Sequence, residues 1–137
     1  MRAVLDPNVV ISAALSPSGA PAQVLVAWLE GRFEVIASPQ MVDELARALA
    51  YPKLRKRIRE EDAQALVRLV ARGSVLRDDI DGPPRISPDP GDDYLIALAK
   101  ENEAVLVSGD RDLLSLAPDL PVFTPRKFLG WLDRQQR

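Results

Sequence analysis

The sequence contains neither cysteine nor histidine. Without cysteine the chain can form no disulfide and offers no thiolate nucleophile, and without both residue types it cannot build a zinc site from cysteine or histidine ligands. The missing imidazole also removes the side chain that enzymes use most often for proton transfer. Any catalysis must therefore depend on carboxylates, hydroxyls, amines or metal ions.

Long apolar runs are missing as well. No segment approaches the ~20 apolar residues that a membrane-spanning helix needs, and the amino-terminal MRAVLDPNV has no apolar run of signal-peptide length. We therefore expect a cytoplasmic protein that does not contact a membrane.

The composition is that of an ordinary folded domain. The chain has 137 residues, of which 47% are hydrophobic and 28% are charged, so it lies far from the composition of disordered proteins. A chain of this length buries roughly two thirds of its unfolded surface around one core. We expect a single domain that spans residues 1–137.

Short apolar segments typical of buried strands alternate with segments of helical periodicity. Strands are predicted at 2–6, at 32–37, near 74–77, at 104–110 and at 120–123, with helices at 21–30, from Pro39 to Tyr51, at 62–73 with Asp62 as its cap, from Pro90 and from Pro125. Residues 53–59 are expected to form a basic turn. This alternation predicts an α/β fold, a three-layer α/β/α sandwich around a mostly parallel sheet.

Acidic residues follow two of the predicted strands. Asp6 and Asp110 stand at carboxyl ends of strands, where parallel sheets collect their ligands, and Asp112 comes two residues after Asp110. The helices that begin at Pro39 and Pro90 would bring Glu44 and Asp92 to the same edge if the connections are right-handed. We therefore expect these acids to face one another.

Clustered carboxylates repel one another unless a cation lies among them. A ligand set made only of oxygen suits Mg²⁺ or Mn²⁺, and the lack of histidine and cysteine argues against softer metals. One or two such ions can activate water and stabilise the leaving oxygen of a phosphodiester. The pattern therefore indicates metal-dependent hydrolysis of a phosphodiester.

Each acid also has an ordinary structural explanation. Asp6 could simply cap the helix that begins at Pro7, Glu44 could be a solvated helix residue, and Asp112 could cap the turn DLLSL. In the run from Asp89 to Asp93 we choose Asp92, because apolar residues follow it at helical spacing whereas Lys100 follows Asp93 at i+7. Asp89 is best explained as a cap.

Basic residues gather in the segment KLRKRIR, residues 53–59. Lys53, Arg55, Lys56 and Arg57 are candidates to hold a phosphate backbone, although a solvated helix face explains the pattern equally well. The net charge of −2 becomes +4 when six acids are left out of the count (Asp6, Glu44, Asp92, Asp93, Asp110 and Asp112). A basic surface around an acidic site would suit an anionic substrate.

Four motifs in this order, LDPNVVIS, VDELARAL, DDYLIALAKE and LVSGDRDLL, resemble the PIN domain family. The resemblance covers the chain from Asp6 to about Phe123. It implies a Mg²⁺- or Mn²⁺-dependent ribonuclease with a central parallel sheet, and many small members are VapC-like toxins of toxin–antitoxin modules. For such a toxin the resemblance implies an antitoxin partner and a homodimer.

The resemblance also assigns roles to particular residues. It implies that Asp6, Glu44, Asp92 and Asp110 are the catalytic metal-binding acids, with Asp112 as a further acid, while Asn8 and Ser108 would support the ligands through hydrogen bonds. The chain departs from the family at Pro7, where a threonine is common, and this removes a hydroxyl and a backbone donor beside the first ligand.

Three other classes share some of these features. A haloacid-dehalogenase-like phosphatase would use Asp6 as nucleophile but usually has a second aspartate where this chain has Asn8. A receiver-like signalling domain needs an aspartate after its third strand and a lysine after its last strand, and the segments VLRDD and TPRK fit these poorly. A PIN fold used only for binding RNA or a partner is the third alternative.

Overall fold

The computed structural model describes residues 1–136, and in chain order they form fourteen elements. The strands are β1 (Arg2–Leu5), β2 (Glu34–Ala37), β3 (Val75–Leu76), β4 (Val105–Val107) and β5 (Val122–Phe123). The helices are α1 (Pro7–Leu15), α2 (Ala20–Leu29), α3 (Pro39–Leu49), α4 (Pro52–Arg55), α5 (Glu60–Gly73), the 3₁₀ turn η1 (Pro90–Asp92), α6 (Asp93–Glu101), α7 (Arg111–Leu114) and α8 (Pro125–Gln135).

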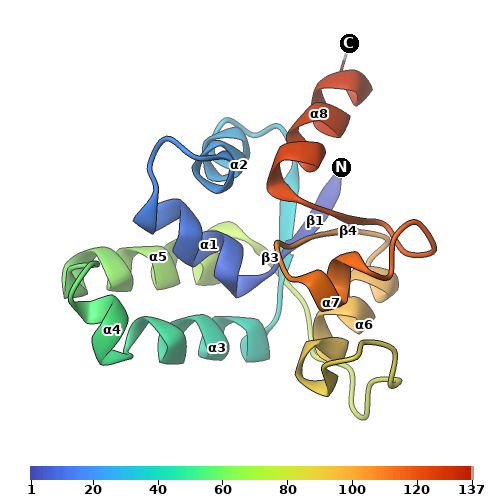
Figure 1. Cartoon of the computed structure of the whole chain (residues 1–137), viewed down its shortest axis with the longest axis horizontal. Coiled ribbons are helices and arrows are strands. Elements are labelled where there is room, and N and C mark those ends of the chain that lie inside the picture. The colour runs from blue at the N-terminus through green and yellow to red at the C-terminus, as the bar shows by residue number, and fades with distance from the viewer. Residues whose placement is uncertain (137) are drawn as a thin grey trace.

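The five strands form one parallel sheet in the order β3-β2-β1-β4-β5. β1 is the central strand, and Ala3 and Leu5 pair with Val105 and Val107 of β4. Figure 1 shows α1, α2 and α5 on one side of the strands and α6 on the other. The predicted α/β/α sandwich with a parallel sheet is confirmed.

The direction in which the chain crosses the sheet reverses between β1 and β4. From β1 the chain continues outward through β2 to β3, and it then returns to place β4 and β5 on the other side of β1. In open parallel sheets ligands bind at such a reversal, beyond the carboxyl ends of the two strands, because the following loops separate there. Asp6 follows β1 and Asp110 lies in the loop after β4, so both lie at this position.

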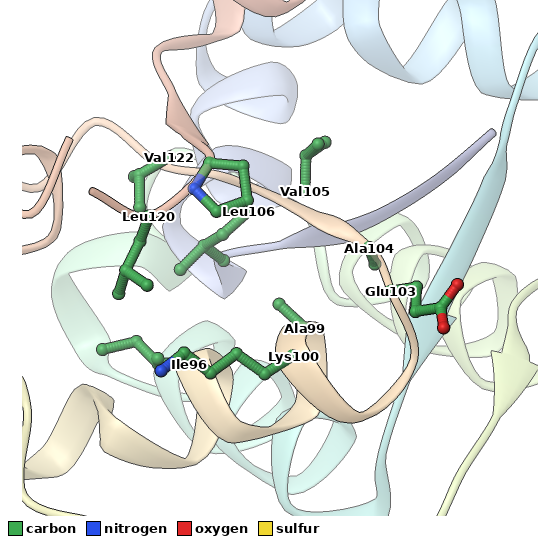
Figure 2. A pocket seen from close by; sticks show the side chains of 10 residues that line it. Ile96, Ala99, Lys100, Glu103, Ala104, Val105, Leu106, Leu120 and Val122 are labelled. Carbon is green, nitrogen blue, oxygen red and sulfur yellow. The ribbon is translucent and has the colours of Figure 1, made fainter. Parts of the chain in front are cut away.

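The amino ends of the same strands lie at the opposite edge and have a different character. A hollow opens there between α6, β4 and β5 (Figure 2), and its walls are almost entirely apolar, with Leu106, Leu120 and Val122 on one side and Ile96 on the other. Lys100 and Glu103 are its charged residues. This hollow contains none of the acids singled out from the sequence.

Several helix starts are set by proline and a capping side chain. α1, α3 and α8 each have proline in the first turn, where a missing N–H costs nothing. The Oγ of Ser38 accepts a hydrogen bond from the backbone N–H of Met41 at 3.3 Å, and Oγ1 of Thr124 accepts one from that of Lys127 at 3.1 Å. These signals explain why the helix starts could be read from the sequence.

The basic segment departs from the expected turn. Its first residues form the short helix α4, and α5 begins at Glu60, two residues before the predicted cap Asp62. Arg59 occupies the cap position without a side-chain hydrogen bond. The prediction of Asp62 as cap was wrong: three consecutive acids, which the helix dipole favours throughout the first turn, fill that turn.

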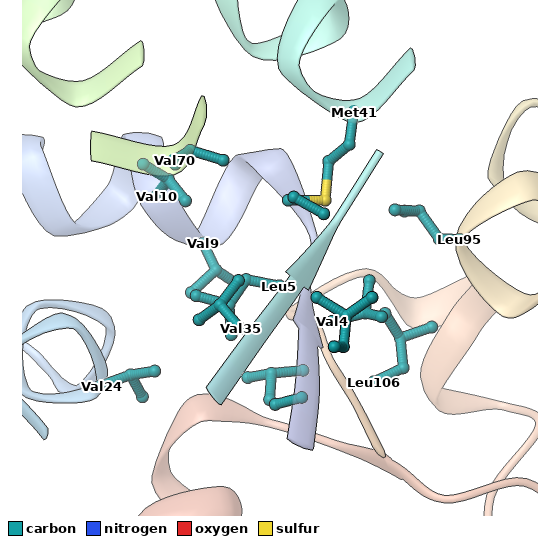
Figure 3. Close-up of a cluster of buried hydrophobic side chains, with 14 of the residues drawn as sticks. Val4, Leu5, Val9, Val10, Val24, Val35, Met41, Val70, Leu95 and Leu106 are labelled. Atoms are coloured by element: carbon teal, nitrogen blue, oxygen red, sulfur yellow. The ribbon is translucent and has the colours of Figure 1, made fainter. Parts of the chain in front are cut away.

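The apolar core holds the site-bearing elements together on both faces of the sheet. In Figure 3, Val4 and Leu106 face Leu95 of α6, whereas Val9 and Val24 lie on the opposite side with α1 and α2. Leu95 is 1% exposed and lies three residues after Asp92, the last of the acids that precede α6. Its packing therefore holds the start of α6 against the sheet.

No single helix within residues 1–136 is long and apolar enough to cross a membrane. α1 and α2 reach that length and apolarity when taken together, and the chain bends by 105° between them.

Replacing Leu95 by alanine should lower the free energy of unfolding by about 2–5 kcal/mol, because the cavity left in a packed core adds to the lost burial. Leu29→Ala is the matched control, since Leu29 is 66% exposed, and it should change the stability by less than about 0.5 kcal/mol. Urea unfolding followed by circular dichroism measures both. Equal effects of the two variants would contradict the described packing of α6.

Candidate functional site

Asp6 is buried at the carboxyl end of β1, with only 3% of its surface exposed. Oδ1 accepts a hydrogen bond from the backbone N–H of Asn8 at 3.0 Å, so Asp6 does cap α1. Oδ2 accepts a second hydrogen bond from the hydroxyl of Ser108 at 2.8 Å. The carboxylate is therefore held in one orientation between β1 and β4.

Ser108 connects this carboxylate to Asp110. The Ser108 side chain is fully buried, and its oxygen also accepts a hydrogen bond from the backbone N–H of Asp110 at 3.0 Å. Asp110 in turn caps α7, because its Oδ1 accepts from the backbone N–H of Asp112 at 2.7 Å. One hydroxyl thus ties the two aspartates at the reversal of the sheet together.

Glu44 reaches the site from the middle of α3. Its Oε2 accepts a hydrogen bond from the hydroxyl of Tyr94, which is 5% exposed and lies near the start of α6. Burial and the adjacent carboxylate of Glu44 raise the pKa of Tyr94, so the phenol stays protonated and donates. Sequence reasoning missed Tyr94, because a tyrosine at helical spacing among apolar residues is indistinguishable from a core residue.

Asp92, the last residue of η1, shows most directly that the acids share one place. Burial raises its pKa to about 7, and the charges of Asp110, Asp6, Asp89 and Glu44 add to the shift in that order. Its Oδ2 is buried and has no hydrogen-bond partner within residues 1–136. Asp6, Glu44 and Asp110 therefore all lie within electrostatic reach of Asp92, and we call these four acids the acidic site.

The site also affects Asp6. Burial is the main reason that the pKa of Asp6 is raised, and the charge of Asp110 adds to it. The hydrogen bonds from Asn8 and Ser108 act in the opposite direction because they stabilise the ionised form. Even two hydrogen bonds leave this carboxylate less acidic than it would be in water.

Asp93 turns away from the acidic site and has a structural role. Its Oδ1 accepts hydrogen bonds from the backbone N–H groups of Ile86 at 3.0 Å and Ser87 at 2.7 Å, and Arg85 approaches Oδ2 at 3.7 Å. Asp93 therefore holds the preceding loop. Asp89 caps η1 through a 2.9 Å hydrogen bond from the backbone N–H of Gly91, as its position before Pro90 predicted.

The donors of the acidic site suit a hard cation, because they are all carboxylate oxygens and one of them is buried without a partner. A divalent ion beside Asp92 would offset the desolvation and repulsion that now raise its pKa. Within the described chain, however, no three acidic side chains converge closely enough to hold one ion as they stand. Holding one would require side-chain rotation, which the half-buried Glu44, Asp92 and Asp110 have more room for than the buried Asp6.

Asp112, predicted as a further metal-binding acid, and Asn8, predicted as a supporting residue, differ from the rest. Asp112 is half-buried and contacts Asp110 through its backbone N–H, and it is not among the charges that raise the pKa of Asp6 or Asp92. The side chain of Asn8 is exposed, and the hydrogen bond to Asp6 comes from its backbone. Any residue at position 8 other than proline could supply that bond.

The predicted basic residues lie apart from the acids. Lys53, Arg55, Lys56 and Arg57 are exposed, and they follow the carboxyl end of α3, a helix of eleven residues and about 16 Å. Figure 1 shows α4, which carries two of them, at the far end of α3 from α6 and α7. Two other arginines line hollows that contain members of the acidic site: Arg126 with Asp110, and Arg47 with Glu44. Sequence reasoning did not assign Arg47 or Arg126 to the site.

Comparison with known proteins places these features in a family. A sequence model described as PIN domain matches residues 2–112. The uncharacterized protein MJ1680 of Methanocaldococcus jannaschii is 32% identical over 147 aligned positions, which cover 98% of this chain and 93% of that protein.

Solved structures share the fold. PAE2754 from Pyrobaculum aerophilum has a TM-score of 0.67 at 17% identity, covering 98% of this chain and 90% of its own. VapBC2 from Rickettsia felis, solved bound to a DNA fragment from its promoter, has a TM-score of 0.64 at 15% identity. The match covers 89% of this chain and 97% of that one. FitAcB from Neisseria gonorrhoeae has a TM-score of 0.53 at 22% identity, and the match covers 90% of this chain and 98% of that one.

Removing the charge of Asp92 should stabilise the metal-free protein. Its pKa of about 7 in the folded chain exceeds the ordinary 3.8, so the folded state binds more protons than the unfolded state and stability falls as the pH rises between these values. Asp92→Asn should therefore raise the Tm most above about pH 7 and progressively less toward about pH 4. Thermal unfolding in EDTA across this range measures the effect.

Asp93→Asn is the matched control for this experiment. It weakens a buried acceptor of two backbone hydrogen bonds and should lower the Tm throughout the range. An Asp92→Asn effect that does not change with pH would contradict the electrostatic description of the acidic site.

Proposed function

Because this chain belongs to the PIN domain family, we propose that it is a metal-dependent endoribonuclease that hydrolyses RNA phosphodiesters. The observation that carries the proposal is that Asp6, Glu44 and Asp110, from three separate segments, all act electrostatically on Asp92, which keeps a buried, unpartnered oxygen. Four charges that repel one another are costly unless a cation binds among them. Helix capping explains Asp6 and Asp110 but not the buried, unpartnered oxygen of Asp92, whereas a cation bound for phosphodiester hydrolysis would account for it.

The four acids would hold Mg²⁺ or Mn²⁺. A bound ion of this kind activates a water molecule and stabilises the charge that develops on the phosphate and the leaving oxygen. Asp6 offers the most rigid ligand because both its oxygens are already hydrogen-bonded. Asp92 offers the oxygen in greatest need of a partner, and Asp112 is a further candidate ligand beside Asp110.

The neighbours of the acids would position them. The Ser108 hydroxyl donates to Asp6 and accepts from the backbone of Asp110, so it fixes the distance between the two strand ends. The Tyr94 phenol leaves Glu44 with one oxygen directed elsewhere. Hydrogen bonds of this type orient metal ligands. Removing such a hydrogen-bonding partner typically lowers metal affinity or activity by about 10- to 100-fold.

Pro7 is compatible with this function. The family commonly has threonine at this position, but Pro7 occupies the first helical turn, where its missing N–H would have no partner. The hydrogen bond to Asp6 comes instead from the next residue, Asn8. Asp6 therefore has an oriented carboxylate although Pro7 donates no hydrogen bond.

We also propose that the protein is the toxin of a toxin–antitoxin module, with a cognate antitoxin as partner and a homodimer as its assembly. The family resemblance implies these partners, and the likeness of the fold to VapBC2 and FitAcB supports them. A segment of the antitoxin that carries arginine or lysine would complement the acidic site.

Purified protein should cleave RNA in the presence of Mg²⁺ or Mn²⁺ and lose this activity in EDTA. Glu44→Gln should reduce the rate roughly 100-fold or more, because it removes a charge that holds the ion. Asp43→Asn is the matched control: Asp43 is the exposed neighbour of Glu44 on α3 and its loss should leave the rate unchanged. A gel assay with labelled RNA measures both, and equal rates for the two variants would reject the assignment.

Mg²⁺ should also stabilise the folded protein without any RNA. At a concentration ~100 times its Kd a ligand adds about 2.7 kcal/mol, which for a chain of this length raises the Tm by roughly 5–15 °C. Asp110→Asn should abolish most of this shift, since asparagine keeps the cap of α7 but not the charge. Differential scanning fluorimetry measures the shift, and an unchanged response of the variant would place the ion elsewhere.

A further inference from the structure

Two hollows flank the acidic site, and each shares one acid with it. The first, which we call the Arg126 hollow, lies between α1, the loop after β4 and the start of α8, and it is lined by Asp110, Asn8, Ser12 and Arg126 among others. The second, the Tyr51 hollow, is lined by Glu44, Arg47, Tyr51 and Gly91. One hollow therefore adjoins the acidic site at Asp110 and the other adjoins it at Glu44.

Each hollow carries one cation that the fold does not use. Arg126 and Arg47 line the two hollows beside Asp110 and Glu44, yet neither has an ion-pair partner within residues 1–136, in contrast to Arg32 or Arg55. Guanidinium groups bind phosphate through fixed, paired N–H donors. The two arginines are thus available to an anionic ligand, one beside Asp110 and the other beside Glu44.

The Tyr51 hollow adds an exposed aromatic ring. Tyr51 is 66% exposed, and it is not one of the paired aromatic rings of the described chain, which are Phe33, Phe123, Phe128 and Trp131. Its backbone oxygen accepts the first hydrogen bonds of α4, a task that needs no ring. An exposed ring beside an arginine is a stacking surface for an unpaired nucleobase.

The Arg126 hollow combines polar and apolar walls. Asn8, Ser12 and Thr124 offer side-chain hydrogen-bonding groups, while Val9, Pro21 and Pro125 form apolar surface. A nucleotide has the same two parts, a phosphate with sugar hydroxyls and a flat base. Arg126 is the one positive charge that lines this hollow in the described chain.

We propose that the RNA strand crosses the acidic site between these two hollows, with Arg126 binding a phosphate on one side and Arg47 binding a phosphate on the other, where Tyr51 stacks on a base. This proposal rests on the nuclease function proposed above and names residues that hold its substrate. α4 begins directly after Tyr51, so Lys53 would extend the same path away from the acids.

Binding of a short, unstructured, fluorescein-labelled RNA, followed by anisotropy in EDTA between about 50 and 200 mM salt, separates the roles of the residues. Every protein also carries Asp110→Asn, which removes one negative charge and, with EDTA, prevents the proposed cleavage. The protein with this change alone is called the parent protein. Tyr51→Ala should weaken binding about fivefold or more at each salt concentration with an unchanged salt slope. Tyr51→Phe should bind like the parent protein because the ring remains.

The arginine variants should behave differently. Arg126→Ala and Arg47→Ala should each reduce the slope of log K against log salt by about 0.7, because each removes one phosphate contact to a single strand. Arg72→Ala is the matched control: Arg72 is exposed in the last turn of α5 and lines neither hollow. Its slope should equal that of the parent protein.

Three results would overturn the proposed path: parent-like binding by all the alanine variants, equal weakening by Tyr51→Phe and Tyr51→Ala, or no RNA binding by the parent protein at any salt concentration. The cleavage assay decides the nuclease function separately. Cleavage together with unaffected binding would reject the path and retain the nuclease. Weakened binding without cleavage by the natural protein would retain the path and reject the nuclease.

Discussion

The pairing of β1 with β4 is the constraint on which the site depends. The two strands are about a hundred residues apart in the chain, and their parallel register brings Asp6 beside the loop that carries Asp110. The Ser108 hydroxyl then connects both residues through hydrogen bonds of 2.8 and 3.0 Å. The chain reverses direction across the sheet here, and open parallel sheets bind ligands beyond the carboxyl ends of the strands at such a reversal. This is the position at which we propose that the ion binds.

The acidic site opposes the stability of the domain that carries it. Asp92 keeps a buried oxygen without a partner and a pKa near 7, and Asp6 is also harder to ionise than it would be in water. The surrounding structure compensates through the dense core on both faces of the sheet and through Asp93, whose carboxylate holds the loop before α6. Two adjacent aspartates therefore have opposite roles, one electrostatically costly and one structural.

Helix capping and the proposed binding of a metal ion involve the same side chains. Asp6 caps α1 and Asp110 caps α7, and each hydrogen bond occupies one carboxylate oxygen. The ordinary explanation of Asp6 as a cap was therefore correct, and it does not compete with a functional role. The two hydrogen bonds to Asp6 hold its carboxylate in one orientation, which would lower the entropic cost of binding an ion at that residue.

The sequence by itself determined the fold class, the strands, most helix starts and the family, because these depend on local periodicity, on proline with a capping residue, and on motifs in a fixed order. It also indicated which acids belong to the strand ends. Only the tertiary structure decided that Tyr94 bonds to Glu44, that Arg47 and Arg126 rather than residues 53–57 adjoin the acids, and that α5 begins before Asp62. These features depend on which distant side chains meet across α3, α6 and α8, and a one-dimensional pattern does not specify such contacts.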